Sequence, residues 1–453
     1  MIMVEESQCL SVIADLSPMR LPSCSRRSAG REMSVSQLRW CILIMLLFTS
    51  IASAADTGRW PQFHGPTMDN RVSDRGLPLS WSESSNVVWK TEVAGRAWSS
   101  PVVWASQVWL TNATKDGRRM SVVCLDLETG RVIHDILLHE TENPAEINSV
   151  NSYASPTPAI EEGRLYAHFG SHGTFCLDTS SGKTLWTRQD LKCDHEVGPG
   201  SSVVLRGDRL FLSFDGIDVR FLVALDTRTG RTVWRIDRDI SYSVSDSMRK
   251  AFSTPAFGGE NGELLISAGA GAAMAFTAAT GNECWRVRYG NGFSTSSRVR
   301  VFRDLVFLNS GYSRPRLIAV RLGGQGDVTD SHVVWETKKD VPIRSSPVLV
   351  NDLLFMVSDQ GVASCLEPAT GELIWRERLG GGRHSASPLV VGNRIYFMDE
   401  KGKTTVIEGR REFSKVGEGK LDEGFMASPA VVGESFVLRT RTHVYRIASI
   451  RSQ

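Results

Sequence analysis

Three adjacent titratable residues, Asp194, His195 and Glu196, form the densest cluster in the sequence that could do chemistry. Imidazole and carboxylate side chains can bind a metal ion or act as a general base. Adjacent residues rarely all converge on one ion, and no second ligand stands at the spacing of a metal site. We therefore expect no metal site, and we keep Asp194, His195, Glu196 and Asp246 as candidate catalytic residues. A solvated loop with turn residues at 198–200 is the alternative interpretation.

Basic side chains recur before or inside several segments that are expected to face a central binding mouth. A ring of such cations would favour a carboxylate, a phosphate or a quinone acid through charge-assisted hydrogen bonds. Glu142, Asp194, Glu196 and Asp246 could equally neutralise the cations in a structural network. The candidate ligand-binding residues are Arg249, Lys250, Arg298, Arg314, Arg344, Arg383 and His384.

A repeated cassette indicates which elements position these residues. Asp-x-x-Thr-Gly or Asp-x-x-Ser-Gly, with a tryptophan shortly after the glycine, spans Asp178 to Trp186 and Asp226 to Trp234. Copies with altered first residues span Thr277 to Trp285 and Glu367 to Trp375. A period of roughly 40 to 50 residues is typical of one supersecondary unit copied many times, each copy needing neighbours to bury its apolar faces.

A second cassette, a serine or threonine usually followed by proline, opens each unit. Its copies are followed by short apolar runs separated by turn residues, which predict four antiparallel strands per unit. Proline suits the start of an inner edge strand, and tryptophan fills the wedge between units. His134 and Phe413 stand in the tryptophan position of the two units that lack it. The eight copies begin at Ser100, Ser155, Ser202, Thr254, Ser296, Ser346, Ser387 and Ser428.

The last unit is one strand short, which predicts how the two ends of the repeat meet. Only three strands follow Ser428, whereas residues 86–93, with Trp89 in the tryptophan position, precede the first cassette. Pairing of this N-terminal strand with the last unit would close the ring of units, so the exposed edges of an open array would not remain. The predicted fold is all-β: an eight-bladed β-propeller of four-stranded antiparallel blades, closed by pairing of this N-terminal strand with the last blade.

The cassettes, Leu225 to Trp234 above all, resemble the pyrroloquinoline-quinone (PQQ) repeat family of eight-bladed propellers over about residues 86–449. The opening Trp60 to Pro66 is similar to the start of many exported PQQ-like proteins. The family includes PQQ-dependent alcohol and glucose dehydrogenases and the non-enzymatic assembly factor BamB. For the dehydrogenases, the resemblance implies PQQ in the central funnel, a calcium ion with acidic and amide ligands, and an aspartate base. Many also have an adjacent-cysteine pair, and this sequence has neither such a pair nor a Cys-x-x-Cys-His segment.

Three function hypotheses follow. The first is an exported, non-catalytic propeller that binds a protein segment or envelope component through its funnel, with no cofactor. The alternative is a PQQ-dependent dehydrogenase that oxidises an alcohol or sugar, with PQQ and calcium, Asp194 or Asp246 as base, and the basic ring holding the quinone carboxylates. The third is a hydrolase or lyase that uses Asp194, His195 and Glu196.

Composition and the N-terminus restrict the partners. The net charge is +2, and no basic run interleaved with aromatics occurs, so no nucleic-acid partner is expected. The apolar run from Trp40 to Phe48 is shorter than the roughly 20 residues that span a bilayer, so we predict a signal peptide rather than a transmembrane anchor, and a periplasmic or extracellular protein. The predicted parts are a leader at 1–54 that starts at Met33 and is cleaved near Ala54, an N-terminal extension at 55–85, the propeller at 86–449 and a tail at 450–453.

Overall fold

The computed structural model describes residues 58–240 and 245–450. Within these ranges the chain forms eight sheets and almost no helix, so the predicted all-β fold of four-stranded antiparallel units is confirmed. No helix among these residues is long and apolar enough to cross a bilayer. The predicted signal peptide and its cleavage site near Ala54 lie outside the described residues.

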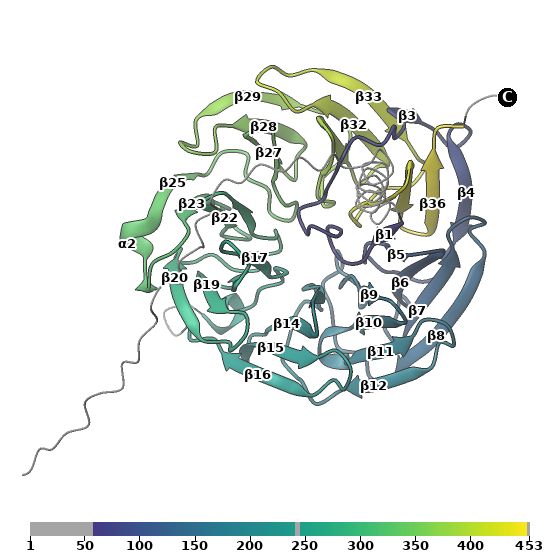
Figure 1. The fold of residues 1–453 in the computed structure, drawn as a ribbon, viewed down its shortest axis with the longest axis horizontal. Helices are drawn as coiled ribbons and strands as arrows, with labels where there is room; N and C mark the ends of the chain where they lie inside the picture. Colours follow the sequence, from purple (N-terminus) through teal and green to yellow (C-terminus); the bar gives the residue numbers. More distant parts are fainter. Residues whose placement is uncertain (1–57, 241–244, 451–453) are drawn as a thin grey trace, which may run out of the picture. The chain divides into compact units, whose positions relative to one another are not determined.

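Each sheet is built on four antiparallel strands. In Figure 1 the fourth strands, such as β12, β16 and β29, lie at the rim, and earlier strands such as β9 and β17 lie toward the middle. The first four sets are β5 (Val102–Trp104), β6 (Gln107–Ala113), β7 (Arg119–Asp126) and β8 (Val132–Glu140); β9 (Ala159–Glu161), β10 (Arg164–His168), β11 (Thr174–Asp178) and β12 (Thr184–Arg188); β13 (Val204–Arg206), β14 (Arg209–Asp215), β15 (Arg220–Asp226) and β16 (Thr232–Asp237); and β17 (Ala256–Gly258), β18 (Leu264–Ala268), β19 (Ala272–Thr277) and β20 (Glu283–Arg288).

The remaining four sets complete the series. The last of them takes its fourth strand from the start of the described chain. They are β21 (Arg300–Phe302), β22 (Leu305–Asn309), β23 (Leu317–Arg321) and β25 (Val333–Thr337); β26 (Val348–Val350), β27 (Leu353–Val357), β28 (Val362–Leu366) and β29 (Leu373–Arg378); β30 (Leu389–Val391), β31 (Arg394–Met398), β32 (Lys403–Glu408) and β33 (Lys415–Lys420); and β34 (Ala430–Val432), β35 (Ser435–Arg439), β36 (His443–Ala448) and β4 (Val87–Glu92).

In the last set, β4 pairs antiparallel with β36, and Trp89 lies opposite Arg446.

Short elements are added to these eight sets. The additional elements are β1 (Arg59–Trp60), which pairs with β5; β2 (Arg71–Val72) and β3 (Ser80–Trp81), which pair in parallel with β30 and β33; β24 (Gly326–Asp327), which pairs in parallel with β20; and η1 (Gly170–His172), η2 (Asp246–Met248) and α2 (Thr329–His332).

Tryptophans on the fourth strands connect neighbouring sheets. The indole nitrogen of Trp186 on β12 donates to the carbonyl oxygen of Thr227, in the cassette of the next sheet, at 3.0 Å. The glycine of that cassette, Gly230, has a φ of +68°, and a Cβ there would lie 2.7 Å from the Trp186 ring. Only glycine fits both this backbone conformation and the adjacent indole. Corresponding bonds join Trp89 to Leu127, Trp234 to Ala278, Trp335 to Pro368 and Trp375 to Arg410.

The strand position opposite the tryptophan takes a small, buried side chain in five sheets, those of Trp186, Trp234, Trp285, Trp335 and Trp375. Cys124 lies opposite His134, whose ring stacks on Trp109 with centroids 5.7 Å apart. His134 therefore occupies the predicted tryptophan position. Burial raises the pKa of the Cys124 thiol to about 12, as expected for an unreactive core cysteine. Cys176 and Cys365 occupy the same position in their sheets, and all three thiols are free.

The seventh sheet departs from the prediction. Its tryptophan position is held by Gly417 and not by Phe413, which packs instead against Trp375 with ring centroids 5.3 Å apart. The missing indole comes from outside the repeat, because Trp81 on β3 covers β33, and a Cβ on Gly419 would lie 2.2 Å from its ring. The prediction of Phe413 at this position was wrong. It followed from the spacing of the cassette, and a contact made by a segment outside the repeat leaves no pattern nearby in the sequence.

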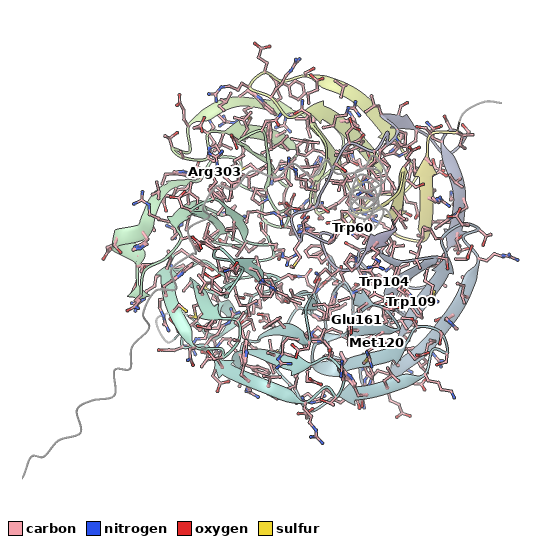
Figure 2. All side chains as sticks on the ribbon, in the orientation of Figure 1. Trp60, Trp104, Trp109, Met120, Glu161 and Arg303 are labelled. Carbon is pink, nitrogen blue, oxygen red and sulfur yellow. The ribbon has the colours of Figure 1, made fainter. Side chains whose placement is uncertain are left out.

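The residues before β4 cross from sheet to sheet, and we call residues 59–81 the crossing segment. Trp60 on β1 is 1% exposed and pairs opposite Val103 of β5. In the view of Figure 2 it lies nearer the middle of the sheets than Trp104 and Trp109. Farther along the segment, hydrogen bonds join Pro61 to Ile160, Gln62 to Leu205, Met68 to Arg300 and Asn70 to Val390. The segment thus contacts the first strands of five sheets: β5, β9, β13, β21 and β30.

Candidate functional site

A cavity of about 570 Å³ lies among the first strands, and we call it the funnel. Phe63 of the crossing segment contributes to its lining. The other aromatic residues of the lining are Trp98, Phe252, Phe293 and Tyr312, and the charged ones are Lys250, Arg344, Asp359 and Arg383. The polar part of the lining includes six hydroxyl residues that come one from each of six sheets: Ser100, Thr157, Ser202, Thr254, Ser387 and Ser428.

These hydroxyls link the sheets to one another. In each link, a backbone N–H in one sheet donates to the hydroxyl oxygen of the corresponding residue in the next sheet, at 2.9 or 3.0 Å. A hydroxyl group that accepts one bond can still donate its proton, so the wall offers donors to the funnel. The links run from Ser100 to Thr157, Thr157 to Ser202, Ser202 to Thr254, Arg298 to Ser346, Ser346 to Ser387, Ser387 to Ser428 and Ser428 to Ser100.

Two positions of the predicted cassette are corrected by these links. In the second sheet the linking residue is Thr157 and not Ser155, and in the fifth it is Arg298 and not Ser296. The linking residue stands two positions before the first strand, as Ser100 does before β5. The run Ser-Pro-Thr-Pro at 155–158 fits the cassette in two registers, and only the strand start distinguishes them.

Arginine and carboxylate side chains neutralise each other at the rim of the funnel. Arg344 donates to Asp359 at 2.9 Å and lies 3.3 Å from Glu400. The Asp359 side chain is 1% exposed and also accepts the backbone N–H of Ile343 at 2.8 Å. Arg383 approaches the same carboxylate at 3.5 Å, but its own side chain is 61% exposed. Arg383 is therefore the rim cation with the most freedom to meet a ligand.

A second ion pair joins two of the predicted candidates. Lys250 contacts both Glu196 and the carbonyl oxygen of Ser247. Burial lowers the pKa of the Lys250 ammonium. Asp246 on η2 is exposed and pairs with Arg249 at 2.9 Å, and neither of these two residues lines the funnel. In both pairs, Lys250 with Glu196 and Arg249 with Asp246, an acidic side chain thus neutralises a basic one, as the second interpretation of the sequence predicted.

Asp194 and His195 do not line the funnel. The carboxylate of Asp194 accepts the backbone N–H of Glu196 at 2.8 Å. The imidazole of His195 lies 3.5 Å from the Sγ atom of Cys193, and burial lowers the pKa of His195 to about 4. Burial raises the pKa of the Cys193 thiol. A neutral imidazole beside a protonated thiol is not an activated nucleophile.

Arg298 is completely buried and holds the crossing segment in place. Its guanidinium donates to the carbonyl oxygens of Phe63 and Pro255, both at 2.8 Å. Arg300, on β21, donates to Met68 at 2.9 Å and lies 3.0 Å from Nδ1 of His64. Burial and the two neighbouring arginines hold the pKa of His64 well below its usual value, so the ring is a neutral acceptor.

The last two candidates lie apart from the cavity. Arg314 is exposed in the turn between β22 and β23, and His384 is 2% exposed beneath the rim. Burial lowers the pKa of His384. Within the described residues, no three His, Cys, Asp or Glu side chains gather as a metal site. Of the residues predicted for ligand binding, Lys250, Arg344 and Arg383 line the funnel.

Several lining residues were missed from the sequence. The hydroxyls were interpreted as strand-start markers, although their regular recurrence was a signal that they meet around one axis. Phe252, Phe293 and Tyr312 carry no local pattern, because each stands in an irregular loop. Phe63 belongs to a segment far from the repeat in sequence, and only the fold brings it to the funnel.

Comparisons with known proteins agree on the fold and diverge on activity. The family described as outer membrane protein assembly factor BamB matches residues 81–328 and 324–450. The quinone alcohol dehydrogenase subunit of Acetobacter aceti is 27% identical over 246 residues, which is 48% of this chain and 32% of that protein. The chain thus spans about a third of the length of the curated dehydrogenases it matches.

Two solved structures have the same type of fold. BamB from Moraxella catarrhalis matches with a TM-score of 0.56 and 15% identity, over 80% of this chain and 99% of that one. The quinohemoprotein alcohol dehydrogenase of Comamonas testosteroni matches with a TM-score of 0.60 and 11% identity, over 89% of this chain and 82% of that one. At such identities the likeness shows a β-propeller type of fold.

Proposed function

Because this chain belongs to the PQQ-like repeat family, we propose that it is an exported, non-catalytic β-propeller that binds a protein segment or another envelope component through its funnel. The protein partner is inferred from the family description, which names an assembly factor. Export is inferred from the leader predicted at residues 1–54.

One observation carries this proposal: the charged groups near the funnel are neutralised by one another, whereas its aromatic and hydroxyl groups face the cavity. Asp359 is the only carboxylate of the lining in the described part of the chain, and it accepts bonds from Arg344 and Ile343. Tyr312, which also lines the funnel, is 54% exposed. Exposed aromatic rings with hydrogen-bond donors around them suit recognition of another molecule.

We also propose that the eight sheets are the blades of one closed propeller. Two contacts between the ends of the repeat support this. β4 pairs with β36, and the backbone N–H of Ser428 in the last sheet donates to the Ser100 hydroxyl of the first at 3.0 Å. A closed ring gives each sheet a neighbour on both sides, which buries the apolar faces of all of them.

A quinone with calcium fits the described residues poorly. The dehydrogenases among the relatives make this group the alternative to consider. Calcium prefers six to eight oxygen ligands, several of them carboxylates, whereas Asp359 is the one carboxylate of the described lining and already binds Arg344. Asp194 and Asp246 do not line the funnel. We therefore derive no oxidation step.

Affinity capture from an envelope extract of the organism that encodes the chain tests the proposal. The bait variants Tyr312→Ala and Arg383→Glu change the funnel, whereas Leu185→Ala and Arg228→Glu make matched changes on an outer strand and in a cassette turn. We expect a stable partner with the wild type and both controls, and its loss with both funnel variants. Equal recovery by all five baits would overturn binding through the funnel.

Incubation of the purified chain with PQQ and calcium, followed by dye reduction with alcohols and sugars, tests the alternative. We expect no stoichiometric quinone binding and no turnover. Turnover that is lost in the Asp359→Asn variant would replace the proposed function with the dehydrogenase.

A further inference from the structure

A groove of about 410 Å³ adjoins the funnel, and we call it the side groove. It lies among loops of the first, sixth, seventh and eighth sheets and shares Trp98, Val150, Arg344 and Met426 with the funnel lining. A ligand longer than one residue can therefore occupy both recesses at once. None of the residues predicted from the sequence, apart from Arg344, belongs to this groove.

Three cations of the side groove have no carboxylate partner within the described residues: Arg96, Lys115 and Arg441. The Arg96 guanidinium lies 5.3 Å from the centre of the Trp98 ring and donates to the carbonyl oxygen of Ser149. Lys115 and Arg441 are exposed. The two contacts of Arg96 hold its side chain along the recess, so this residue loses little conformational freedom when an anion binds.

The two carboxylates of the groove are already engaged. Glu400 accepts the Ser385 hydroxyl at 2.6 Å and lies 3.3 Å from Arg344. Glu423 accepts the backbone N–H of Thr442 at 3.0 Å and its hydroxyl at 2.6 Å, and these bonds help to lower the pKa of Glu423 although its partial burial opposes them. Among the described residues, the groove lining thus carries four cations, Arg96, Lys115, Arg344 and Arg441, against two carboxylates, so positive charge is in excess.

Apolar groups stand next to these cations. Val150 is 59% exposed between the groove and the funnel, beside Trp98 and Met426. A ligand that carried only anionic groups, such as a phosphate-rich surface, would leave this apolar surface in water. An extended peptide places alternate side chains on opposite sides, about 7 Å apart on each side, so it can present carboxylates to the cations and apolar groups to Trp98 and Val150.

We propose that the side groove and the funnel together bind an extended acidic segment of a partner protein. Its carboxylates meet Arg96, Lys115 and Arg441, and its apolar side chains pack on Trp98, Val150 and the funnel aromatics. This inference rests on the proposed function, because it specifies the chemistry of the protein segment that the funnel face recognises.

Selection from a randomised peptide display library on the immobilised full chain tests this proposal and requires no identified partner. We expect the wild type to enrich peptides with several Asp or Glu residues among apolar ones. A triple variant, Arg96→Glu, Lys115→Glu and Arg441→Glu, should bind a selected peptide at least about tenfold more weakly, and higher salt should weaken the wild-type complex. The matched control reverses three arginines in cassette turns, Arg131→Glu, Arg228→Glu and Arg231→Glu, and should bind like the wild type.

The outcomes separate the two proposals. Selected peptides without an excess of acidic residues, or equal binding by both triple variants, would overturn the acidic segment and leave the funnel as a protein-binding site. No peptide above background would contradict the proposed function as well. Cosedimentation with phosphatidylglycerol vesicles that is lost in the groove variant, with no peptide selected, would assign the groove to lipid headgroups and overturn the proposal.

Discussion

The two sides of the funnel are built from different parts of the chain. The rim consists of loops between repeated strands, and its cations include Arg344 and the exposed Arg383. The crossing segment consists of residues that occur once, and it is held by buried Arg298 and Arg300. The two arginines that hold the crossing segment bond to backbone carbonyl oxygens, whereas Arg344 and Arg383 at the rim face carboxylates or solvent.

This difference separates stability from recognition. A buried guanidinium satisfies carbonyl groups that water cannot reach, so its loss leaves them without a donor. An exposed rim guanidinium such as that of Arg383 exchanges its partner for water at little cost. We therefore expect variants of the crossing segment to change the stability of the fold, and variants of the rim to change binding.

The largest effect is expected for Arg298→Met. The variant leaves the carbonyl oxygens of Phe63 and Pro255 without donors in a buried site, and we expect a loss of about 3 kcal/mol of stability. The urea midpoint measures this loss, and limited proteolysis should show faster cleavage within residues 59–81. Arg383→Met, the matched rim change, should stay within about 0.5 kcal/mol. Equal losses for the two variants would remove the distinction between the regions.

A smaller effect is expected from pH through His64. Its pKa in the folded protein is lowered, so between that value and about 6.5 the unfolded chain binds more protons, and stability falls as the pH falls through this range. Between pH 7.5 and pH 5.5, the stability of His64→Gln should therefore fall by about 1 kcal/mol less than the stability of the wild type does. Urea midpoints at the two pH values provide the test.

Two other histidines should also contribute to the loss of stability at low pH, so His64→Gln removes only part of it. Burial also lowers the pKa of His168 to about 3 and of His172 to about 4, so part of the acid sensitivity should persist. An unchanged pH dependence in His64→Gln would show that the crossing segment opens before His64 takes up a proton.

The smallest effect is expected for the hydroxyl links of the funnel. Ser428→Ala removes the acceptor of the Ser387 backbone N–H, which lies 3.0 Å away. Because both residues line the cavity, water can replace the hydroxyl, and we expect a loss of about 1 kcal/mol or less. Ser428→Thr keeps the bond, as Thr157 and Thr254 do in their sheets, and should match the wild type in thermal unfolding. A loss of stability as large as that of Arg298→Met would show that the hydroxyl links stabilise the fold as much as the buried bonds to the crossing segment do.

Contacts between consecutive repeats were predictable. Trp186 and Gly230 each hold a fixed place in their own cassette, so the repeat indicates which positions of neighbouring sheets meet. The strand at residues 86–93 was predicted from what the last unit lacked, and β4 is found beside β36. Phe413 was misplaced because Trp81, from outside the repeat, covers the position that the pattern assigned to it.

Contacts that break the repeat were not predictable. The candidates Asp194, His195 and Glu196 are adjacent in sequence, but Glu196 turns to Lys250 and His195 to Cys193, and the fourth candidate, Asp246, pairs with Arg249. Adjacent residues in a loop point in different directions, and the partner of Glu196 comes from a loop 54 positions away. The groove cations Arg96, Lys115 and Arg441 meet for the same reason, from loops of different sheets.

The sequence by itself determined the four-stranded unit, its repetition and the tryptophan between units, because each depends on residues within one repeat or the next. The tertiary structure alone decided what lines the funnel and what holds the crossing segment. The bond between Arg298 and Phe63 joins residues 235 positions apart, and a pairing used once over such a separation leaves no periodic trace in the chain.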